Sequence, residues 1–209
     1  MDDHEKLFAA ICNGDRNTVV RIVQTVVDGA GDVGQLLKTT MIPAMGEVGE
    51  RFSRNEIFVP EMLVAARAMQ GGLNIIEPIL ANAGHVSLGK VSIGSVKGDL
   101  HDIGKNLVAM MLKGAGFTVE DLGVDVDVED FEQALQRGAQ VLCLSALLTT
   151  TKDEMRVVID HFQGRTDVKI VVGGAVITRE YADEIGADDF GADATDAVRA
   201  VKRCLGLEG

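Results

Sequence analysis

The first part of the chain, up to Gly84, places its apolar residues at helical spacing. The run NTVVRIVQTVV follows Asp15, a residue type that caps helices, and it ends just before Gly29, so it predicts an amphipathic helix. Pro60 marks the start of a further helix. The apolar residues of that helix recur every three or four positions along one face, namely Met62, Leu63, Ala66, Met69, Leu73 and Ile76. We expect four helices that pack as a four-helix bundle.

Beyond the linker-like segment GHVSLGK, the pattern changes to short apolar runs that alternate with helical segments. The runs are VSIGSV, FTVEDLG, VLCLSAL and KIVVGGA. Short and almost continuously apolar runs are typical of parallel strands that are buried on both faces. About five strands favour a flavodoxin-like (Rossmann-type) doubly wound parallel sheet with the order 2-1-3-4-5. The sequence therefore predicts an α + α/β protein, with a helical domain and linker over residues 1–88 and an α/β domain over residues 89–209.

The composition argues against several classes of partner. The chain has 20 Lys and Arg against 32 Asp and Glu, which gives a net charge of -12. Surfaces that bind nucleic acid or anionic lipid need clustered Lys and Arg, so we expect neither partner. The N-terminal MDDHEKLF lacks the layout of a signal peptide and no apolar run spans a membrane, so we expect a cytoplasmic protein. Cys12, Cys143 and Cys204 show no paired spacing, and we expect buried apolar residues.

Clusters of glycine and polar residues follow three of the predicted strands. GDLHDIG comes after the first strand, SALLTTT overlaps the end of the third, and GGA ends the fourth. Ligands of doubly wound sheets bind at the carboxyl ends of the strands, so we expect the three clusters to converge on one ligand. Glycine and hydroxyl residues also occur there for turn geometry or helix capping alone, and that interpretation stays open for each cluster.

The first cluster has the residues of a metal site. His101 belongs to the side-chain type that most often binds transition metals. Asp99, two residues earlier, is placed to accept a hydrogen bond from the ring nitrogen that does not bind the metal, which fixes the tautomer. Gly104 leaves room for a bulky group near the backbone. The alternative is an ordinary loop histidine beside a helix-capping aspartate.

The segment GDLHDIGKNLV resembles the cobalamin-binding signature shared by the cobalamin module of methionine synthase, cobalamin-dependent mutases and the corrinoid proteins of methyltransferase systems. In that family the nucleotide tail of the cofactor leaves the cobalt and enters a channel, and a histidine replaces it, an arrangement called base-off/His-on. The resemblance implies that His101 binds the cobalt of cobalamin, that Asp99 orients His101, and that Thr151 completes the relay through a hydroxyl. It also implies that Gly104 makes room for the tail.

The same resemblance assigns a set of residues to the cofactor. Ser145 and Leu147 match residues that line the tail channel, and Gly173 and Gly174 match a glycine pair along the tail. The full expected set comprises Gly98, Asp99, Leu100, His101, Asp102, Ile103, Gly104, Ser145, Leu147, Thr149, Gly173 and Gly174.

The helical half carries a second resemblance. GEVGERFSRNEIFVPEM is similar to the cap bundle of methionine synthase and of corrinoid methyl carriers, in which an aromatic and an aliphatic side chain cover the upper, methyl-bearing face of the cobalt. The resemblance places Phe52, Val59 and Met62 in this methyl-face cap. Val59 departs from the leucine usual in methionine synthase, which leaves the shape of the cap open. The alternative is that these side chains belong to the bundle core.

Together the two resemblances imply a corrinoid methyl carrier of one-carbon metabolism that is not an enzyme by itself. We expect it to accept a methyl group on cobalt(I) from a substrate-specific methyltransferase of the O-demethylase, methanol, methylamine or betaine type, with O-demethylation preferred. A second methyltransferase would pass the group to a tetrahydrofolate-type or thiol acceptor, and a reductive activation protein would be a further partner. The cofactor would be methylcobalamin or another corrinoid, and the chain would supply no catalytic residue of its own.

Three alternatives remain. The small cobalamin-binding subunit of an adenosylcobalamin-dependent mutase would lack the helical cap. A cobalamin-sensing regulator would need a basic segment that reads DNA, which neither the charge nor the length of the chain provides. A generic flavodoxin-like flavin or interaction domain would have no reason for the His101 loop.

Overall fold

The computed structural model describes residues 2–82 and 87–207, so residues 84–86 of the predicted linker lie outside the described residues. The chain divides into two compact units, Met1–Ser87 with Lys113–Gly116 and Leu88–Leu112 with Phe117–Gly209. Within the described part of the chain, no helix is long and apolar enough to cross a membrane.

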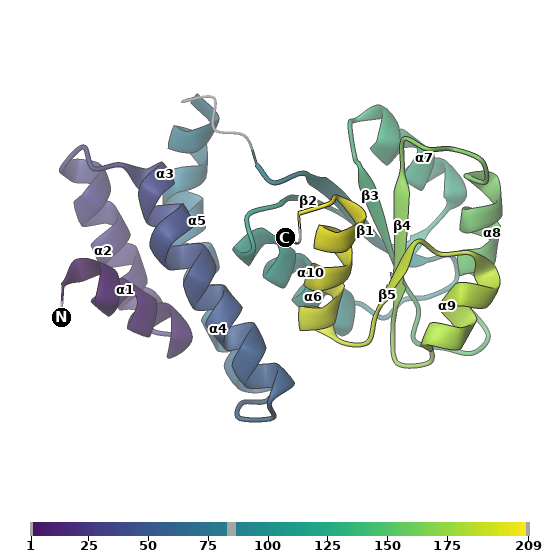
Figure 1. Ribbon diagram of the computed structural model, residues 1–209, viewed down its shortest axis with the longest axis horizontal. Coiled ribbons are helices and arrows are strands. Elements are labelled where there is room, and N and C mark those ends of the chain that lie inside the picture. The colour runs from purple at the N-terminus through teal and green to yellow at the C-terminus, as the bar shows by residue number, and fades with distance from the viewer. Residues whose placement is uncertain (1, 83–86, 208–209) are drawn as a thin grey trace. The chain divides into compact units, whose positions relative to one another are not determined.

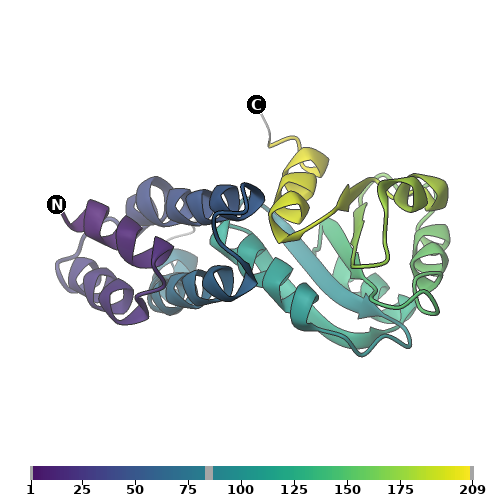
Figure 2. The same cartoon turned by 90° about the horizontal axis from the view of Figure 1, so that it is seen from below.

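The first unit is a bundle of helices. Its elements are α1 (Asp3–Cys12), α2 (Arg16–Asp28), α3 (Val33–Leu36), η1 (Leu37–Met41), α4 (Ile42–Ser53) and α5 (Val59–Asn82). The predicted cap of α2 is confirmed, because the Asp15 side chain accepts a hydrogen bond from the Thr18 N–H. The short α3 runs through η1, a π-helical turn, into α4 without a break. The unit therefore consists of four helical segments that lie alongside one another (Figure 2), and the predicted four-helix bundle is confirmed.

The second unit is a doubly wound α/β domain. Its strands are β1 (Lys90–Val96), β2 (Thr118–Val126), β3 (Val141–Ser145), β4 (Lys169–Gly173) and β5 (Asp189–Gly191). Its helices are α6 (Ile103–Gly114), α7 (Val128–Gln136), α8 (Glu154–His161), α9 (Arg179–Ile185) and α10 (Ala194–Cys204). The strands are parallel in the order β2-β1-β3-β4-β5, as predicted. Figure 1 shows α6 and α10 on one face of the sheet and α7, α8 and α9 on the other.

Apolar packing fixes this sheet between its helices. The central strands are buried on both faces, and Phe131 of α7 and Met155 of α8 have no exposed surface. These two side chains belong to one core cluster that also contains Leu142 and Val172 of the sheet. The nearly continuous burial of β1, β3 and β4 explains why their sequences read as unbroken apolar runs rather than as alternating ones. The edge strand β2 differs from the expected burial, because most of its residues are half-buried or exposed.

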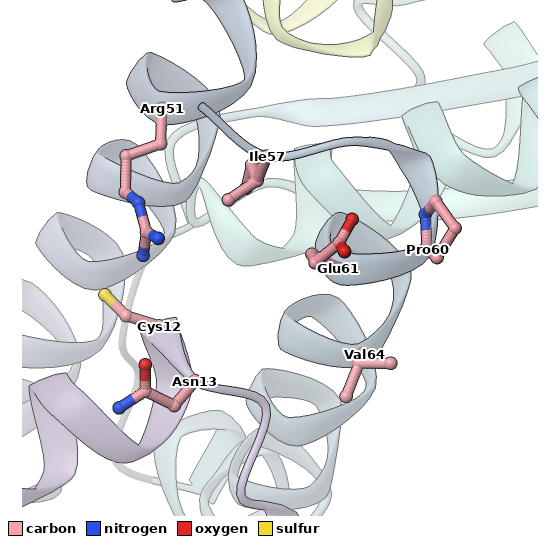
Figure 3. Close-up of a pocket in the computed structure, with 7 residues that line it drawn as sticks. All are labelled: Cys12, Asn13, Arg51, Ile57, Pro60, Glu61 and Val64. Atoms are coloured by element: carbon pink, nitrogen blue, oxygen red, sulfur yellow. The ribbon is translucent and has the colours of Figure 1, made fainter. Parts of the chain in front are cut away.

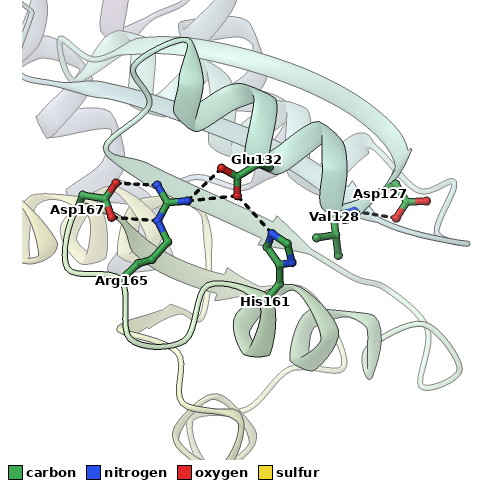
Figure 4. Close-up of polar contacts among 6 residues, drawn as sticks. All are labelled: Asp127, Val128, Glu132, His161, Arg165 and Asp167. Carbon is green, nitrogen blue, oxygen red and sulfur yellow. Dashed lines mark hydrogen bonds and ion pairs between the residues drawn. The ribbon is translucent and has the colours of Figure 1, made fainter.

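Polar contacts join α7 to α8 on the outer surface of the domain (Figure 4). Arg165 donates to both carboxylate oxygens of Glu132 and pairs with Asp167. His161 contacts the same Glu132 carboxylate through Nε2 at 3.3 Å. The Arg165 pairing lowers the pKa of Glu132. All of these side chains are exposed or partly exposed. Ion pairs at the surface contribute little stability, and we assign these groups no functional role.

Candidate cobalamin site

The three predicted clusters start from one row of the sheet. Ser95 of β1 is in register with Ser145 of β3, which is in register with Gly173 of β4. The chain leaves β1 toward β2 on one side and later returns to β3 on the other, so the carboxyl ends of β1 and β3 form the switch point where such sheets bind ligands. The three clusters therefore lie at the same edge of the sheet, and their convergence on one ligand stays a prediction.

A fully buried carboxylate organises the centre of this edge. Oδ1 of Asp99 accepts hydrogen bonds from the backbone N–H of His101 at 3.0 Å and is 2.9 Å from His101 Nδ1. Oδ2 accepts from the Leu147 N–H at 2.8 Å and from the Thr151 hydroxyl at 2.6 Å. Asp99 thus ties the loop after β1 to the segment after β3, and the predicted Asp99–His101–Thr151 contacts are present.

These contacts decide the charge of Asp99. Burial raises the pKa of the carboxyl group, but the hydrogen bonds from Thr151, Leu147 and His101 outweigh burial and hold the pKa well below its usual value. Asp99 is therefore a carboxylate at neutral pH. A carboxylate can only accept hydrogen bonds, so Nδ1 of His101 must carry the proton that lies between the two side chains.

The His101 ring is thereby prepared to bind a metal. With Nδ1 protonated, the neutral ring presents the lone pair of Nε2, and in the described parts of the chain Nε2 has no hydrogen-bond partner. The side chain is 49% exposed, although its carboxylate partner is fully buried. A fixed Nδ1 and an open Nε2 are the arrangement that carboxylate–histidine pairs present to transition metals.

Large apolar side chains surround this polar centre without being covered. Leu100 is 70% exposed and Ile103 is 75% exposed, and Leu147 and Leu148 also lie on the surface. Exposed aliphatic residues that gather around one polar group mark a ligand-binding or interaction site. Their chemistry fits a large, mostly apolar ring system whose metal meets His101.

The glycines of the site fall into two groups. A Cβ atom on Gly174, where φ is +136°, would lie 2.0 Å from the Ala146 carbonyl oxygen, and one on Gly173 would lie 3.0 Å from the Gly191 oxygen. Packing of the chain against itself thus accounts for both. A Cβ atom on Gly104 would have no neighbour within 4 Å, so nothing in the described chain requires glycine there. This open space supports the prediction that Gly104 accommodates part of a ligand.

The remaining predicted residues are distributed around the same edge. Ser145 is half-buried, and its hydroxyl has no partner among the residues that the structure describes. Thr149 is exposed on the turn before α8. The Asp102 side chain accepts from Asn106 Nδ2 at 3.0 Å and so supports the first turn of α6. Gly98, at φ +77°, adopts the left-handed backbone conformation of the turn that leads into Asp99.

In the helical unit, the predicted cap residues differ in exposure. Phe52 is half-buried near the end of α4, and Val59 is exposed at the start of α5. Met62 is fully buried, so its side chain lies in the bundle core and offers no surface to a ligand within this unit. The sequence interpretation missed Phe58, which is 63% exposed. The apolar run of residues 57–59 ahead of Pro60 is the sequence signal that could have identified Phe58.

The structure also shows a buried cation that the sequence interpretation missed. Lys105, on the first turn of α6, is 3% exposed, and its Nζ donates to Asp121 at 2.5 Å and to Asn106 at 2.7 Å. A buried lysine needs such partners, because an unpaired charge in this position would be costly. The pair joins α6, directly after the His101 loop, to β2.

An open pocket of about 340 Å³ lies in the helical unit (Figure 3). It is lined by Cys12, Asn13, Arg51, Ile57, Pro60, Glu61 and Val64.

Burial raises the pKa of the Cys12 thiol despite the nearby Arg51, so the thiol stays neutral. Burial likewise raises the pKa of Cys204 to about 11. We expected all three cysteines to be buried. Cys143 is buried, whereas Cys12 and Cys204 are half-buried.

Comparisons with known proteins agree with this geometry. Two families, each described as a B12 binding domain, match residues 89–202 and residues 4–77. A corrinoid protein of Desulfitobacterium hafniense (strain Y51) is 37% identical, and the match covers 97% of each chain. The trimethylamine corrinoid protein of Methanosarcina barkeri is 39% identical over 99% of this chain and 100% of its own.

Solved structures give the same result. The structure of a cobalamin-binding protein from Desulfitobacterium hafniense DCB-2 matches with a TM-score of 0.77 at 30% identity, over 97% of this chain and 98% of that one. The methanol:cobalamin methyltransferase complex of Methanosarcina barkeri contains a chain that matches with a TM-score of 0.84 at 29% identity, over 99% of this chain and 81% of that one.

Proposed function

Because this chain belongs to the corrinoid proteins with B12 binding domains, we propose that it is the methyl carrier of a multi-component methyltransferase system. The corrinoid would supply the chemistry of methyl transfer when bound, and the chain would hold and orient it. The observation that carries the proposal is His101, whose Nδ1 is held by a buried carboxylate while Nε2 remains open.

The proposed binding mode is base-off/His-on, with Nε2 of His101 on the cobalt. Asp99 holds the proton on Nδ1, so that the lone pair of Nε2 is left to bind the metal. Thr151 and the Leu147 N–H fix the carboxylate from the opposite side. We assign the displaced nucleotide tail to the space beside Gly104, Ser145 and the segment through Thr149 and Gly174. The open surroundings of Gly104 support this assignment, as does the Ser145 hydroxyl, which has no partner among the described residues.

The helical unit is proposed to cover the face of the corrinoid opposite His101. Phe52 and Val59 supply the apolar surface, and the exposed Phe58 extends it, whereas Met62 supports them from the bundle core. An apolar cover of this kind excludes water from a reactive metal centre. The match of the helical unit to a B12 binding domain supports a methyl carrier over the small subunit of a mutase, for which no such cap is expected.

The proposed partners follow from the relatives. Several similar proteins are named trimethylamine or dimethylamine corrinoid proteins, and one similar structure is a methanol:cobalamin methyltransferase complex. These names support a methylamine- or methanol-type methyltransferase as the donor partner, whereas O-demethylation and betaine donors stay predictions. A second methyltransferase with a tetrahydrofolate-type or thiol acceptor and a reductive activation protein complete the proposed system.

A transfer experiment tests the proposal. The protein is loaded with hydroxocobalamin, reduced, and mixed in turn with donor methyltransferases of the trimethylamine, dimethylamine, methanol and methoxyarene classes, each with its isotopically labelled substrate. We expect one class to leave label on the loaded protein, in proportion to the bound corrinoid. The His101→Ala variant, loaded to the same level, is the control for ligation. Failure of the wild-type protein to retain corrinoid, or retention of corrinoid without label from any class, would contradict the carrier function.

A further inference from the structure

The loop between β1 and α6 must hold the His101 backbone as well as its ring. The contacts of Asp99 fix the imidazole relative to Asp99, but both residues belong to the same loop, residues 97–102. If the loop moved as a unit, the ring would move with it. The position of Nε2 therefore also depends on the contacts that fix this loop to the sheet. Two such contacts are separate from the hydrogen bonds between Asp99 and Thr151.

The first contact comes from Ser95, the second-last residue of β1. Its side chain has no exposed surface, and its hydroxyl donates to the backbone carbonyl of His101 at 2.6 Å. The helical hydrogen bonds of α6 begin one residue later, where the Asn106 N–H donates to the Asp102 carbonyl. The His101 carbonyl thus lies outside the helix, and the Ser95 hydroxyl is the donor that reaches it.

The residue type at position 95 fits this task. A buried strand position favours an apolar or β-branched side chain, and an unpaired hydroxyl there would cost free energy. The serine is compatible with burial because its hydroxyl is paired with His101. Ser92 offers a useful comparison on the same strand, because it is also fully buried but its hydroxyl contacts Glu120 at 3.2 Å instead.

The second contact comes from Asp125, near the end of β2. Its carboxylate accepts from the Gly98 N–H at 2.7 Å, and its own N–H donates to the Asp99 carbonyl at 3.0 Å. Asp125 adopts a left-handed backbone, with φ of +55°, at an irregularity in the β1–β2 register. Aspartate and asparagine tolerate this conformation better than other residues with a side chain. This pair of hydrogen bonds fixes the start of the loop, as Ser95 fixes its end.

We infer that Ser95 and Asp125 are positioning residues for the metal ligand, which place Nε2 of His101 by fixing the two ends of its loop to β1 and β2. The inference rests on the proposed function for its meaning, but its structural part does not need the cofactor. Neither residue touches the imidazole ring in the described structure, so both act through the backbone. Asp99 and Thr151 orient the ring and join the loop to the segment after β3, whereas Ser95 and Asp125 fix the two ends of the loop to β1 and β2.

The cofactor-free protein gives the first test. The readout is hydrogen exchange of the His101 backbone amide, measured by nuclear magnetic resonance. Loss of one hydrogen bond should accelerate this exchange about two- to tenfold in Ser95→Ala and in Asp125→Gly. Ser92→Ala removes an equally buried hydroxyl from the same strand and should leave the amide unchanged. Asp125→Asn keeps both the acceptor oxygen and the tolerance for a left-handed backbone, so it should restore slow exchange that Asp125→Gly has lost.

The corrinoid-loaded protein gives the second test. The readout is the fraction of cobalt(II) that carries an axial nitrogen-15 from labelled histidine, measured by paramagnetic resonance. We expect the ratio of histidine-bound to histidine-free cobalt to fall about two- to tenfold in Ser95→Ala and in Asp125→Gly, with Ser92→Ala and Asp125→Asn close to wild type. Asp125 is exposed, so its variants remain informative if Ser95→Ala does not fold.

The outcomes separate this inference from the proposed function. If the wild-type protein shows axial histidine nitrogen and the Ser95 and Asp125 variants match their controls in both readouts, the positioning role is wrong and the proposed ligation stands. If the wild-type protein shows no axial histidine nitrogen, the proposed ligation fails. Faster amide exchange in the two variants would then still support a role in fixing the loop.

Discussion

Thr151→Val isolates the hydroxyl that supports the Asp99 carboxylate. Valine keeps nearly the same shape, while the bond of 2.6 Å from the hydroxyl to Oδ2 disappears from a buried pair. A hydrogen bond to a charged group contributes about 1.5–3 kcal/mol. The Leu147 N–H still donates to Oδ2, so this carboxylate oxygen loses one hydrogen bond and keeps another. We therefore expect the free energy of unfolding at pH 7 to fall by about 1.5–3 kcal/mol.

The pH dependence identifies the cause of this loss. The pKa of Asp99 is lowered in the folded protein, so its contribution to stability is present above the ordinary carboxyl pKa and is lost as the pH falls through the lowered value. Thr151→Val removes part of this contribution. The difference from wild type should thus be constant from pH 8 to pH 5. It should shrink only as the pH falls through the pKa of Asp99 in the variant, which stays below the ordinary carboxyl value because the Leu147 and His101 hydrogen bonds remain.

Urea denaturation across this pH range measures the effect. Thr150→Val, at the exposed neighbouring position, is the matched control and should change stability by less than about 0.5 kcal/mol. A Thr151→Val loss as small as that of the control would refute the reasoning. So would a loss that already shrinks between pH 8 and pH 5, because Asp99 stays ionised in both proteins over that range.

Four further variants test the glycine and cap assignments. Gly174→Ala should destabilise the α/β unit by about 3 kcal/mol or more in urea denaturation, because its Cβ would meet the Ala146 oxygen at 2.0 Å in a strained backbone. Gly104→Ala should leave stability within about 1 kcal/mol but weaken corrinoid binding in equilibrium dialysis, and unchanged binding would contradict the tail assignment. Met62→Ala should cost about 2–5 kcal/mol in urea denaturation of the helical unit, whereas the exposed Phe58→Ala should cost less than about 0.5 kcal/mol; equal losses would contradict their different burial.

Periodicity and turn chemistry were sufficient to predict the fold. The apolar runs became β1 to β4, and the position of Pro60 agreed with the start of α5 at Val59. The strand order followed because the crossover rules leave few topologies for five parallel strands. The three-residue β5 had no pattern long enough to be read by itself. The π-helical turn Leu37–Met41 also lacks a signal, because its residues have ordinary helical character.

The site was only partly accessible from the sequence. Asp99 and His101 are two residues apart, so their contact was readable as a local pattern, and the resemblance added Thr151 from fifty-two residues away. Ser95 and Asp125 were missed because their partners are backbone groups, which leave no residue pattern in the sequence. For Met62, the helical stripe indicated the core and the resemblance indicated the cap, and burial favours the stripe.

The glycine pair shows a different limit of sequence reasoning. Gly173 and Gly174 match the family pattern, but their close approach to Gly191 and Ala146 explains them without a ligand. Gly104 matches the same pattern and has open surroundings. A sequence cannot distinguish these cases, because the difference lies in what a missing Cβ would touch.

The axial nitrogen of the bound corrinoid tests the central claim most directly. Wild-type protein is prepared with histidine labelled with nitrogen-15, loaded with cobalamin, and reduced to cobalt(II) for paramagnetic resonance. If Nε2 of His101 binds the metal, the nitrogen splitting changes from the pattern of nitrogen-14 to that of nitrogen-15. Labelled His101→Ala provides the control and should show no nitrogen-15 coupling. An unchanged nitrogen-14 pattern in the labelled wild-type protein would show that the nucleotide tail stays on the cobalt, which would contradict the account.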